Sequence, residues 1–319
     1  MNQLAIFTAP KPFTNPHIRT IQRNAISSWK ALGDAVEVWL VGDEDGVAQT
    51  AAEFGVGFIP DVQRNSSGTP RIDSIFNMVR ERSDAPFMCY VNADILLFPD
   101  LLQTLQSVSH EYERFLLIGQ RWDASITTEL VIKPGWHEEF VPLAMKTATL
   151  HTAVGSDYFV FPRDEYKDIP AFAVGRAGWD NWMIYKGRAE QIAVIDATSS
   201  ITVIHQNHDF SHFPDGKIHR MQPETMENLD LAGGRHTIYS LYDASHKIIK
   251  GSVKRIRLNR WKLMREICIF PSVTLHWPWL ARITYVLFNP RRAARDWRQD
   301  GELRRAAKEA LNEKRSESN

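Results

Sequence analysis

The sequence contains little cysteine, only Cys89 and Cys268 among 319 residues. Two cysteines cannot form the disulfide network on which small secreted domains depend, which argues against that class of protein. Cys89 lies in the apolar run FMCYV, where a small core residue is expected and not a nucleophile. The N-terminus, MNQLAIFTAPKPF, lacks the basic start and long apolar run of a signal peptide and predicts a first strand. We therefore expect a cytoplasmic protein.

The chain also lacks net charge, because 38 Lys and Arg balance 38 Asp and Glu. The charges are nevertheless unevenly placed. Residues 250–319 hold 17 basic and 7 acidic side chains, a net charge of +10, so residues 1–249 carry −10. A basic tail on an acidic body favours an anionic partner such as the inner face of a membrane, and a solvated helical tail is the alternative.

No hydrophobic run is long and unbroken enough to predict a membrane span. The most apolar segment, 266–288, is interrupted by Pro271, Pro278, His276 and Arg282. Trp277 and Trp279, with seven Lys and Arg between residues 250 and 265, would suit a peripheral position at an anionic interface. Packing of this segment against the rest of the protein is the alternative. Nucleic-acid binding is disfavoured, because the tryptophans lie among aliphatic residues and not in a stacking series.

Short apolar strands alternate with amphipathic helices over the first 120 residues. Asn15 and Pro16 predict the start of a helix that ends at Gly33, and Gly55 ends a second helix over VAQTAAEF. Strands are predicted over LAIFTA, VEVWLVG and FMCYV, and a third helix over residues 71–82. Such a series predicts a parallel sheet covered by helices, with ligands at the carboxyl ends of its strands. The residues at those ends are Thr8, Ala9, Pro10, Gly42, Asp43, Glu44, Asn92, Ala93 and Asp94.

The rest of the chain is less regular. A strand is predicted over YFVFP (158–162), a helix over residues 180–188, and strands near 192–195 and 201–204. Residues 236–250 are predicted to be helical, and residues 251–319 form a distinct basic tail.

The strongest chemical signal is YVNADILLFPD, residues 90–100. An apolar strand ends in Asn92, Ala93 and Asp94, and a second apolar stretch begins at once. A carboxylate beside a core strand is costly to bury unless it is paired or binds a metal ion. A hard divalent cation, held by few carboxylates and otherwise by phosphate oxygens, would suit Asp94. A simple polar turn is the alternative.

A second signal is the histidine-rich segment VIHQNHDFSHFPDG, residues 203–216. His205, His208 and His212 lie within eight residues, just after a predicted strand. If that strand neighbours the one before Asp94, His205 and His208 emerge at the same edge, where neutral imidazole could bind a metal ion. A zinc site made by all three histidines and a hydrogen-bonded polar loop are the alternatives.

A third signal is a carboxylate between two tryptophans, Trp179, Asp180 and Trp182, at the predicted start of a helix. Indole faces suit a sugar ring, so both tryptophans are candidate acceptor-binding residues. An apolar wall would also raise the pKa of Asp180 toward that of a useful base. The alternative is that Asp180 is an N-cap and both tryptophans are core residues.

Two weaker segments complete the candidates. Asp157 follows Gly155 and Ser156 just before a strand, where it could hydrogen-bond acceptor hydroxyls or simply form a turn. The segment NSSGTPRIDSIF (65–76) places a polar loop before a helix, whose N-terminal amides and Arg71 would suit a phosphate. It contains no P-loop pattern.

Together these segments resemble the GT-A glycosyltransferases, in particular a bacterial and plant group with GTP…SIF, YVNADI, WDNW and HQNHD segments. The resemblance covers roughly residues 3–215. It places Asn92 and Asp94 in the DxD motif, with Asn92 replacing the usual first Asp, and implies that Asp94 binds Mn²⁺ or Mg²⁺ together with His205 or His208. It implies that Asp180 is the general base of an inverting enzyme. The residues that match the nucleobase and ribose region are Thr8, Ala9, Pro10 and Asp43.

The resemblance implies an α/β fold of the GT-A type, with a mixed sheet flanked by helices. Residues 1–235 would be the catalytic domain, with a nucleotide-sugar half (1–120) and an acceptor half (121–235), followed by a helical extension (236–319). It implies metal-assisted, inverting transfer of a hexosyl or deoxyhexosyl group from a UDP- or dTDP-sugar. The acceptor would be a saccharide or lipid-linked molecule in polysaccharide biosynthesis.

Other classes of protein remain as alternatives. A zinc-dependent hydrolase would use His205, His208 and His212. A nucleotidyltransferase that makes nucleotide sugars needs a glycine-rich basic loop after the first strand, whereas TAPKPFTNP has one lysine and no glycine. A non-catalytic sugar-binding protein would explain the tryptophans but not the placement of Asp94 and the histidines.

Overall fold

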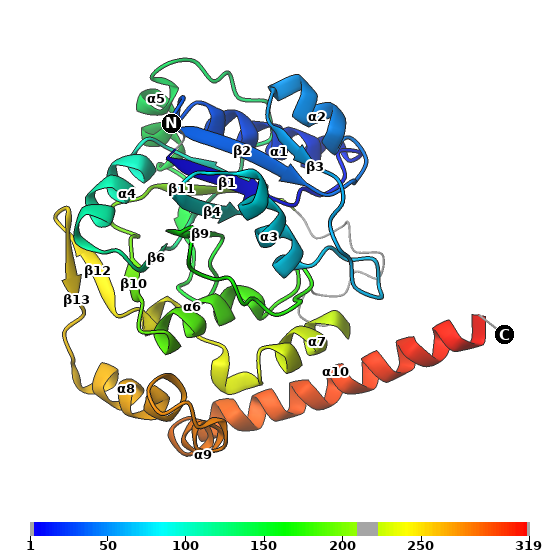
Figure 1. Ribbon diagram of the computed structural model, residues 1–319, viewed down its shortest axis with the longest axis vertical. Coiled ribbons are helices and arrows are strands. Elements are labelled where there is room, and N and C mark those ends of the chain that lie inside the picture. Colours follow the sequence, from blue (N-terminus) through cyan, green and yellow to red (C-terminus); the bar gives the residue numbers. More distant parts are fainter. Residues whose placement is uncertain (1–2, 209–222, 318–319) are drawn as a thin grey trace.

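The computed structural model of the chain describes residues 3–208 and 223–317. A sheet of nine strands runs through the body, with helices on both sides (Figure 1). In spatial order the strands are β13 (Ser252–Arg255), β12 (His246–Ile249), β10 (Ala193–Asp196), β6 (Phe115–Ile118), β9 (Tyr158–Pro162), β4 (Phe87–Val91), β1 (Leu4–Thr8), β2 (Val36–Val41) and β3 (Gly57–Ile59).

The large sheet is mixed, as the resemblance to GT-A enzymes implies. β3, β2, β1 and β4 are parallel, which confirms the β–α–β series of the first half. β9 is antiparallel to both of its neighbours, β4 and β6, whereas β6, β10 and β12 run parallel to one another. The carboxyl ends of β1, β2 and β4 therefore meet at one edge, where ligands bind in such sheets.

Alternating side chains of the strands supply two cores, one on each face of the sheet. In β1, Ala5 and Phe7 join the core that contains buried residues of α3 and α6, whereas Leu4 and Ile6 join the core that contains those of α1 and α4. This alternation is the period of two that a strand covered on both sides requires. The helices of this layer are α1 (Pro16–Lys30), α2 (Val47–Phe54), α3 (Ile72–Arg82), α4 (Asp100–Glu111) and α6 (Trp179–Ala189).

Local signals set the ends of the first two helices. The side chain of Asn15 accepts from the backbone N–H groups of His17 (2.9 Å) and Ile18 (3.1 Å), which confirms it as the N-cap of α1. α2 ends at Gly55, whose positive φ of 61° gives the left-handed C-cap that glycine favours.

A smaller sheet of four strands lies beside the first and carries part of the site. Its order is β5 (Ile95–Leu97), β11 (Val203–Gln206), β7 (Trp122–Ala124) and β8 (Thr149–Leu150). β11 is antiparallel to β5 and parallel to β7, so His205 lies opposite both Ile95 and Asp123. The helix α5 (Trp136–Ala144) packs Trp136 and Phe140 against Phe98.

The prediction of a helix over residues 236–250 is wrong. This segment contains two short 3-10 turns, Arg235–Thr237 and Leu241–Asp243, followed by β12. β12 pairs with β13 through a two-residue turn in which Lys250 and Gly251 both have positive φ, 51° and 75°. Such turns match the twist of antiparallel strands and favour a hairpin. The large sheet therefore continues beyond residue 235, and the helical part of the tail begins only at α8.

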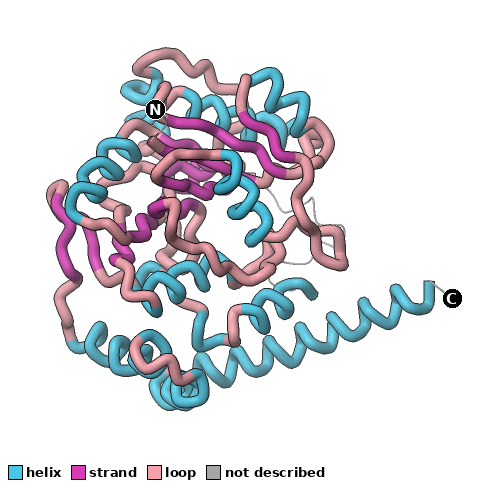
Figure 2. The backbone as a smooth tube through the Cα atoms, viewed as in Figure 1, coloured by secondary structure: helices cyan, strands magenta, loops and turns pink. Residues whose placement is uncertain are grey.

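The C-terminal end of the molecule is made of helices: α8 (Arg260–Val273), α9 (Pro278–Phe288) and α10 (Pro290–Glu317). Figure 2 shows that α8 and α9 lie below the strands and that α10 leads away from the body. α7 (Pro223–Leu231) packs on α10, where Met226, Leu229 and Leu303 form a small core. Within residues 3–208 and 223–317, no helix is both long and apolar enough to cross a membrane.

Candidate active site

The turn between β4 and β5 presents Asp94, and Asn92 anchors it. The backbone N–H of Asn92 donates to the carbonyl of Asp157 (2.9 Å), and its side-chain amide donates to the carboxylate of Asp157 (2.8 Å). The carbonyl of Asn92 accepts from the N–H of Ile95 (3.2 Å), which closes the turn. The turn reading of this segment is thus correct for Asn92, while Asp94 is left to face the histidines.

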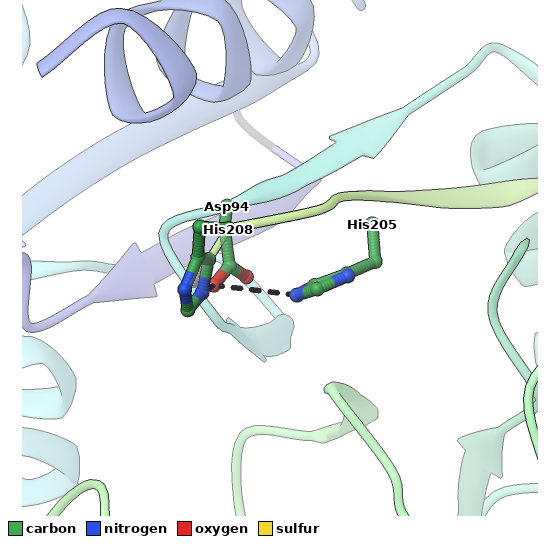
Figure 3. A group of neighbouring side chains, drawn as sticks. All are labelled: Asp94, His205 and His208. Carbon is green, nitrogen blue, oxygen red and sulfur yellow. Dashed lines mark hydrogen bonds and ion pairs between the residues drawn. The ribbon is translucent and has the colours of Figure 1, made fainter. Parts of the chain in front are cut away.

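Asp94, His205 and His208 point toward one another (Figure 3). Asp94 Oδ2 lies 3.1 Å from His208 Nε2 and 3.7 Å from His205 Nε2. One ligand atom from each residue lies within 4.8 Å of the other two, which is close enough for all three to hold one ion. The histidines reach Asp94 because β11 pairs with β5, the strand that follows Asp94, and not with β4 itself. His212 lies outside the described residues.

The electrostatics of this cluster stabilise the ionised form of Asp94. Burial disfavours the charge of Asp94, but hydrogen bonds to His205 and His208 and the charges of His205 and Lys11 outweigh burial and hold its pKa well below the usual value. Burial likewise lowers the pKa of His205, but its interactions with Asp94 raise it above the ordinary value. Asp94 Oδ1 is buried and has no hydrogen-bond partner among the described residues. A bound cation would satisfy this oxygen.

A second carboxylate lies behind His205. Asp123 Oδ1 is 3.2 Å from His205 Nδ1, on the side of the ring opposite Asp94. Asp123 is itself held by Arg121 (2.9 Å) and by His151 Nδ1 (2.7 Å). Histidines that bind metal ions commonly present their second nitrogen to a carboxylate, which fixes the ring and its tautomer. Asp123 lies on the corresponding side of His205, at ion-pair distance, but His205 Nδ1 makes no hydrogen bond among the described residues.

Asp157 supports the site from within the protein. It is 7% exposed, and its Oδ1 accepts from Asn92 (2.8 Å) and from Arg121 (2.5 Å). Asp157 therefore joins the Asn92 turn to the Arg121–Asp123 pair behind His205. Asp157 Oδ1 is thus used internally, and binding of an acceptor by this carboxylate stays a prediction.

Asp180 lies in the first turn of α6. Gly178 and not Asp180 is the N-cap residue, since Asp180 has already entered the helix. Burial raises the pKa of Asp180 to about 6; the charge of Asp157 adds to this, and hydrogen bonds from the backbone of Asn181 and Gly178 oppose it. The charges of Asp94, Asp157 and Asp180 all act on Tyr90, whose pKa is raised mainly by burial. The three carboxylates thus lie close enough to Tyr90 for their charges to act on it.

The tryptophans beside Asp180 do not form the predicted open platform. Trp179 and Trp182 are only 5% and 6% exposed. The ring of Trp179 packs edge-on against Tyr90, and that of Trp182 against Phe172. The burial of both rings agrees with the core alternative, and binding of an acceptor by them stays a prediction. Trp residues at the start of a helix against a sheet are buried because their large apolar area stabilises the fold.

The predicted donor residues lie at or near the expected edge but differ in exposure. Thr8 is fully buried at the end of β1, and its hydroxyl has no hydrogen-bond partner among the described residues. Asp43 is exposed after β2 and pairs with Arg64. Arg71 pairs with Asp73 (2.5 Å) at the start of α3, which partly neutralises the charge proposed for a phosphate. Ala9 and Pro10 continue from Thr8 at the same edge.

Several residues of the site are missed from the sequence. Lys11 lies close enough to Asp94 for the two charges to interact, and the strand-end argument could have found it, since it follows Pro10 directly. Arg121, Asp123 and His151 carry no such signal. They belong to or adjoin β7 and β8, two strands of three residues or fewer that the hydrophobic pattern does not predict.

The sequence matches no protein-family model and no curated protein. Solved structures to which the chain is similar include S. aureus TarS 1–349 in complex with UDP-GlcNAc, with 15% identity and a TM-score of 0.46 over 73% of this chain and 65% of TarS. Another is the glucosyl-3-phosphoglycerate synthase of M. tuberculosis in complex with Mg²⁺ and UDP, with 14% identity and a TM-score of 0.45 over 81% of this chain and 87% of the synthase. These likenesses concern the fold alone, and the mixed α/β architecture is established by the order of the strands.

Proposed function

We propose that the protein transfers a sugar from a nucleoside-diphosphate sugar to a hydroxyl group of an acceptor. The observation that carries the proposal is the convergence of Asp94, His205 and His208 beside the carboxyl ends of β1, β2 and β4. The partnerless buried oxygen of Asp94 supports a cation there. The resemblance of the sequence to GT-A enzymes supplies the reaction class.

Asp94, His205 and His208 would hold a divalent cation. A mixed set of one carboxylate and two imidazoles fits Mn²⁺ better than Mg²⁺, which prefers oxygen ligands. The ion would neutralise charge on the departing nucleoside diphosphate. Lys11, whose charge interacts with Asp94, would add a positive charge near the same phosphates.

Asp180 is proposed as the general base. The acceptor oxygen forms a bond to the anomeric carbon while the bond from that carbon to the diphosphate breaks. The proton of the acceptor hydroxyl passes to the carboxylate of Asp180, and the diphosphate departs with the bonding electron pair. A pKa of about 6 leaves Asp180 mostly ionised at neutral pH yet more basic than an ordinary aspartate. A single displacement of this kind inverts the configuration.

The finer identity of the substrates is part of the proposal. The donor would be a UDP- or dTDP-sugar that carries a hexosyl or deoxyhexosyl group. The acceptor would be a saccharide or a lipid-linked saccharide in polysaccharide biosynthesis. Asp43 and the residues after β1 would contact the nucleoside, as the resemblance of the sequence implies.

A thermal-shift panel tests the donor site. UDP, dTDP, GDP and CDP are each added with and without Mn²⁺, and the unfolding temperature is measured. One nucleotide is expected to raise it clearly, and only with the metal, because a ligand stabilises the native state in proportion to its occupancy. Zinc alone stabilising the protein, with no response to any nucleotide, would contradict the proposal and favour a zinc-dependent hydrolase.

The substitution Asp123→Asn tests the residue behind His205. We expect the Mn²⁺ concentration for half-maximal stabilisation by the nucleotide to rise about 10- to 100-fold, because loss of such a partner commonly weakens metal binding by that factor. Saturating Mn²⁺ should restore the full shift. A merely structural role would lower the unfolding temperature without changing the Mn²⁺ requirement. Asp168→Asn, which changes an exposed carboxylate, is the matched control.

A further inference from the structure

The outer faces of α8 and α9 are apolar and exposed. α8 keeps Cys268, Ile269 and Val273 inside the protein, each at 4% exposure or less. Its other face carries side chains that are 46–48% exposed, namely Leu263, Met264, Ile267 and Phe270. The exposed apolar side chains of α9 are 37–70% exposed, namely Trp279, Ile283, Val286, Leu287 and Phe288. The two helices pack together, since the hydroxyl of Thr284 donates to the carbonyl of Cys268 (2.8 Å).

Exposed tryptophans surround these faces. Trp277 and Trp279 stack at the start of α9 with ring centroids 6.1 Å apart. Trp261 at the start of α8 is 56% exposed, and Trp297 on α10 is 82% exposed. The protein buries Trp29, Trp179 and Trp182 elsewhere, so the exposure of these other tryptophans indicates a surface that binds another molecule. Tryptophan is enriched at the boundary between lipid and water, because its ring is apolar and its N–H is polar.

The same region is strongly basic. Residues 254–298 contain 11 Lys and Arg and only two acidic residues, a net charge of +9. Both acidic residues are used internally. Glu266 pairs with Arg188 (2.7 Å) and Lys262 (3.1 Å), and Asp296 accepts a hydrogen bond from Tyr285. The outer surface therefore combines apolar side chains with a positive field, which complements an anionic partner.

A cavity of about 250 Å³ lies between the segment Ser240 to Asp243, α8, and the junction of α9 and α10. Trp261, Met264 and Phe288 supply apolar walls. Arg292 also lines the cavity, with 46% of its side chain exposed and its Nε 3.8 Å from Asp296. The neighbouring Arg265 is bound to Asp243 (2.6 and 3.0 Å). The cavity thus joins apolar walls to one accessible guanidinium, a combination that suits a phosphate group attached to an acyl chain.

We propose that the outer faces of α8 and α9 and the first turns of α10 dock the protein on the surface of an anionic lipid bilayer. The apolar side chains would enter the boundary between headgroups and acyl chains, and Arg292 would receive a lipid phosphate. A second copy of the chain fits this surface poorly, because two regions of +9 would face each other. Figure 1 places α8 and α9 at one end of the molecule.

Vesicle sedimentation of the full chain tests this surface without nucleotide or metal, so its result is independent of the proposed transfer reaction. We expect the protein to pellet with phosphatidylcholine vesicles that contain phosphatidylglycerol and not with phosphatidylcholine alone, and we expect added salt to weaken binding. The double variant Trp279→Ser, Leu287→Ser should bind about tenfold more weakly or worse, and so should Arg291→Glu, Arg295→Glu.

The matched control removes exposed apolar side chains elsewhere. Val131 and Leu143 are 74% and 63% exposed, so the double variant Val131→Ser, Leu143→Ser should bind vesicles as the parent protein does. Equal pelleting with neutral and anionic vesicles, or equal loss in the control, would overturn the proposal. If the parent protein is a dimer in light scattering and Trp279→Ser, Leu287→Ser is a monomer, the surface belongs to a second copy instead.

Discussion

Replacement of Asp94 by alanine is expected to abolish the metal-dependent stabilisation by the nucleotide and to lower turnover on the order of 10³-fold. The magnitude follows from the several kcal/mol of charge stabilisation that a metal ion gives a departing diphosphate. Asp94 supplies the only carboxylate of the described metal cluster. Its Oδ2 contacts His208, and its Oδ1 is buried without a hydrogen-bond partner among the described residues. Thermal shift and a transfer assay with the responsive nucleotide sugar measure the two effects.

The matched control for Asp94→Ala is Asp34→Ala, which removes an exposed carboxylate before β2, at the opposite edge of the sheet. It should leave both measurements unchanged. If Asp94→Ala keeps the Mn²⁺-dependent shift, the cation does not bind at this cluster, and the proposed donor site is wrong even if transfer activity persists.

Replacement of Asp180 by asparagine is expected to lower kcat on the order of 10²- to 10⁴-fold, the contribution usual for a positioned general base. The amide keeps the shape of the side chain but cannot accept the proton. Binding of the nucleotide and Mn²⁺ should survive, because Asp180 does not belong to the Asp94 cluster. Thermal shift and initial rates on the same variant separate the two properties, and Asp84→Asn, an exposed carboxylate, is the control.

The pH dependence of the parent enzyme gives an independent test of Asp180. A base must be ionised, and the pKa of Asp180 is raised to about 6, so kcat should fall as the pH drops through that value and level off above it. Asp180→Asn should lose this limb of the profile. A variant that retains both near-normal turnover and the acidic limb would show that another group accepts the proton.

Much of the first half of the fold could be predicted, because its signals are local. Asn15 caps the start of α1 with its side chain, and Gly55 ends α2 with its left-handed backbone. The apolar runs of β1, β2 and β4 predict buried strands. The position of Asp94 followed from the rule that ligands meet at the carboxyl ends of parallel strands. The same rule predicts that His205 and His208 lie near Asp94. In the structure these histidines reach Asp94 because β11 pairs with β5 in the second sheet.

What the sequence determined by itself was therefore the class of fold and the residues with unusual chemistry in apolar surroundings. Only the tertiary structure decided which of them face a common point and which face the core. Trp179 and Trp182 are residues of the type that binds sugar rings, but their rings pack against Tyr90 and Phe172. Asp123 became part of the site only because β7 pairs with β11, and the apolar residues of α8 and α9 proved exposed only once the helices were placed. Burial and contact depend on residues distant in the chain, and no local pattern encodes them.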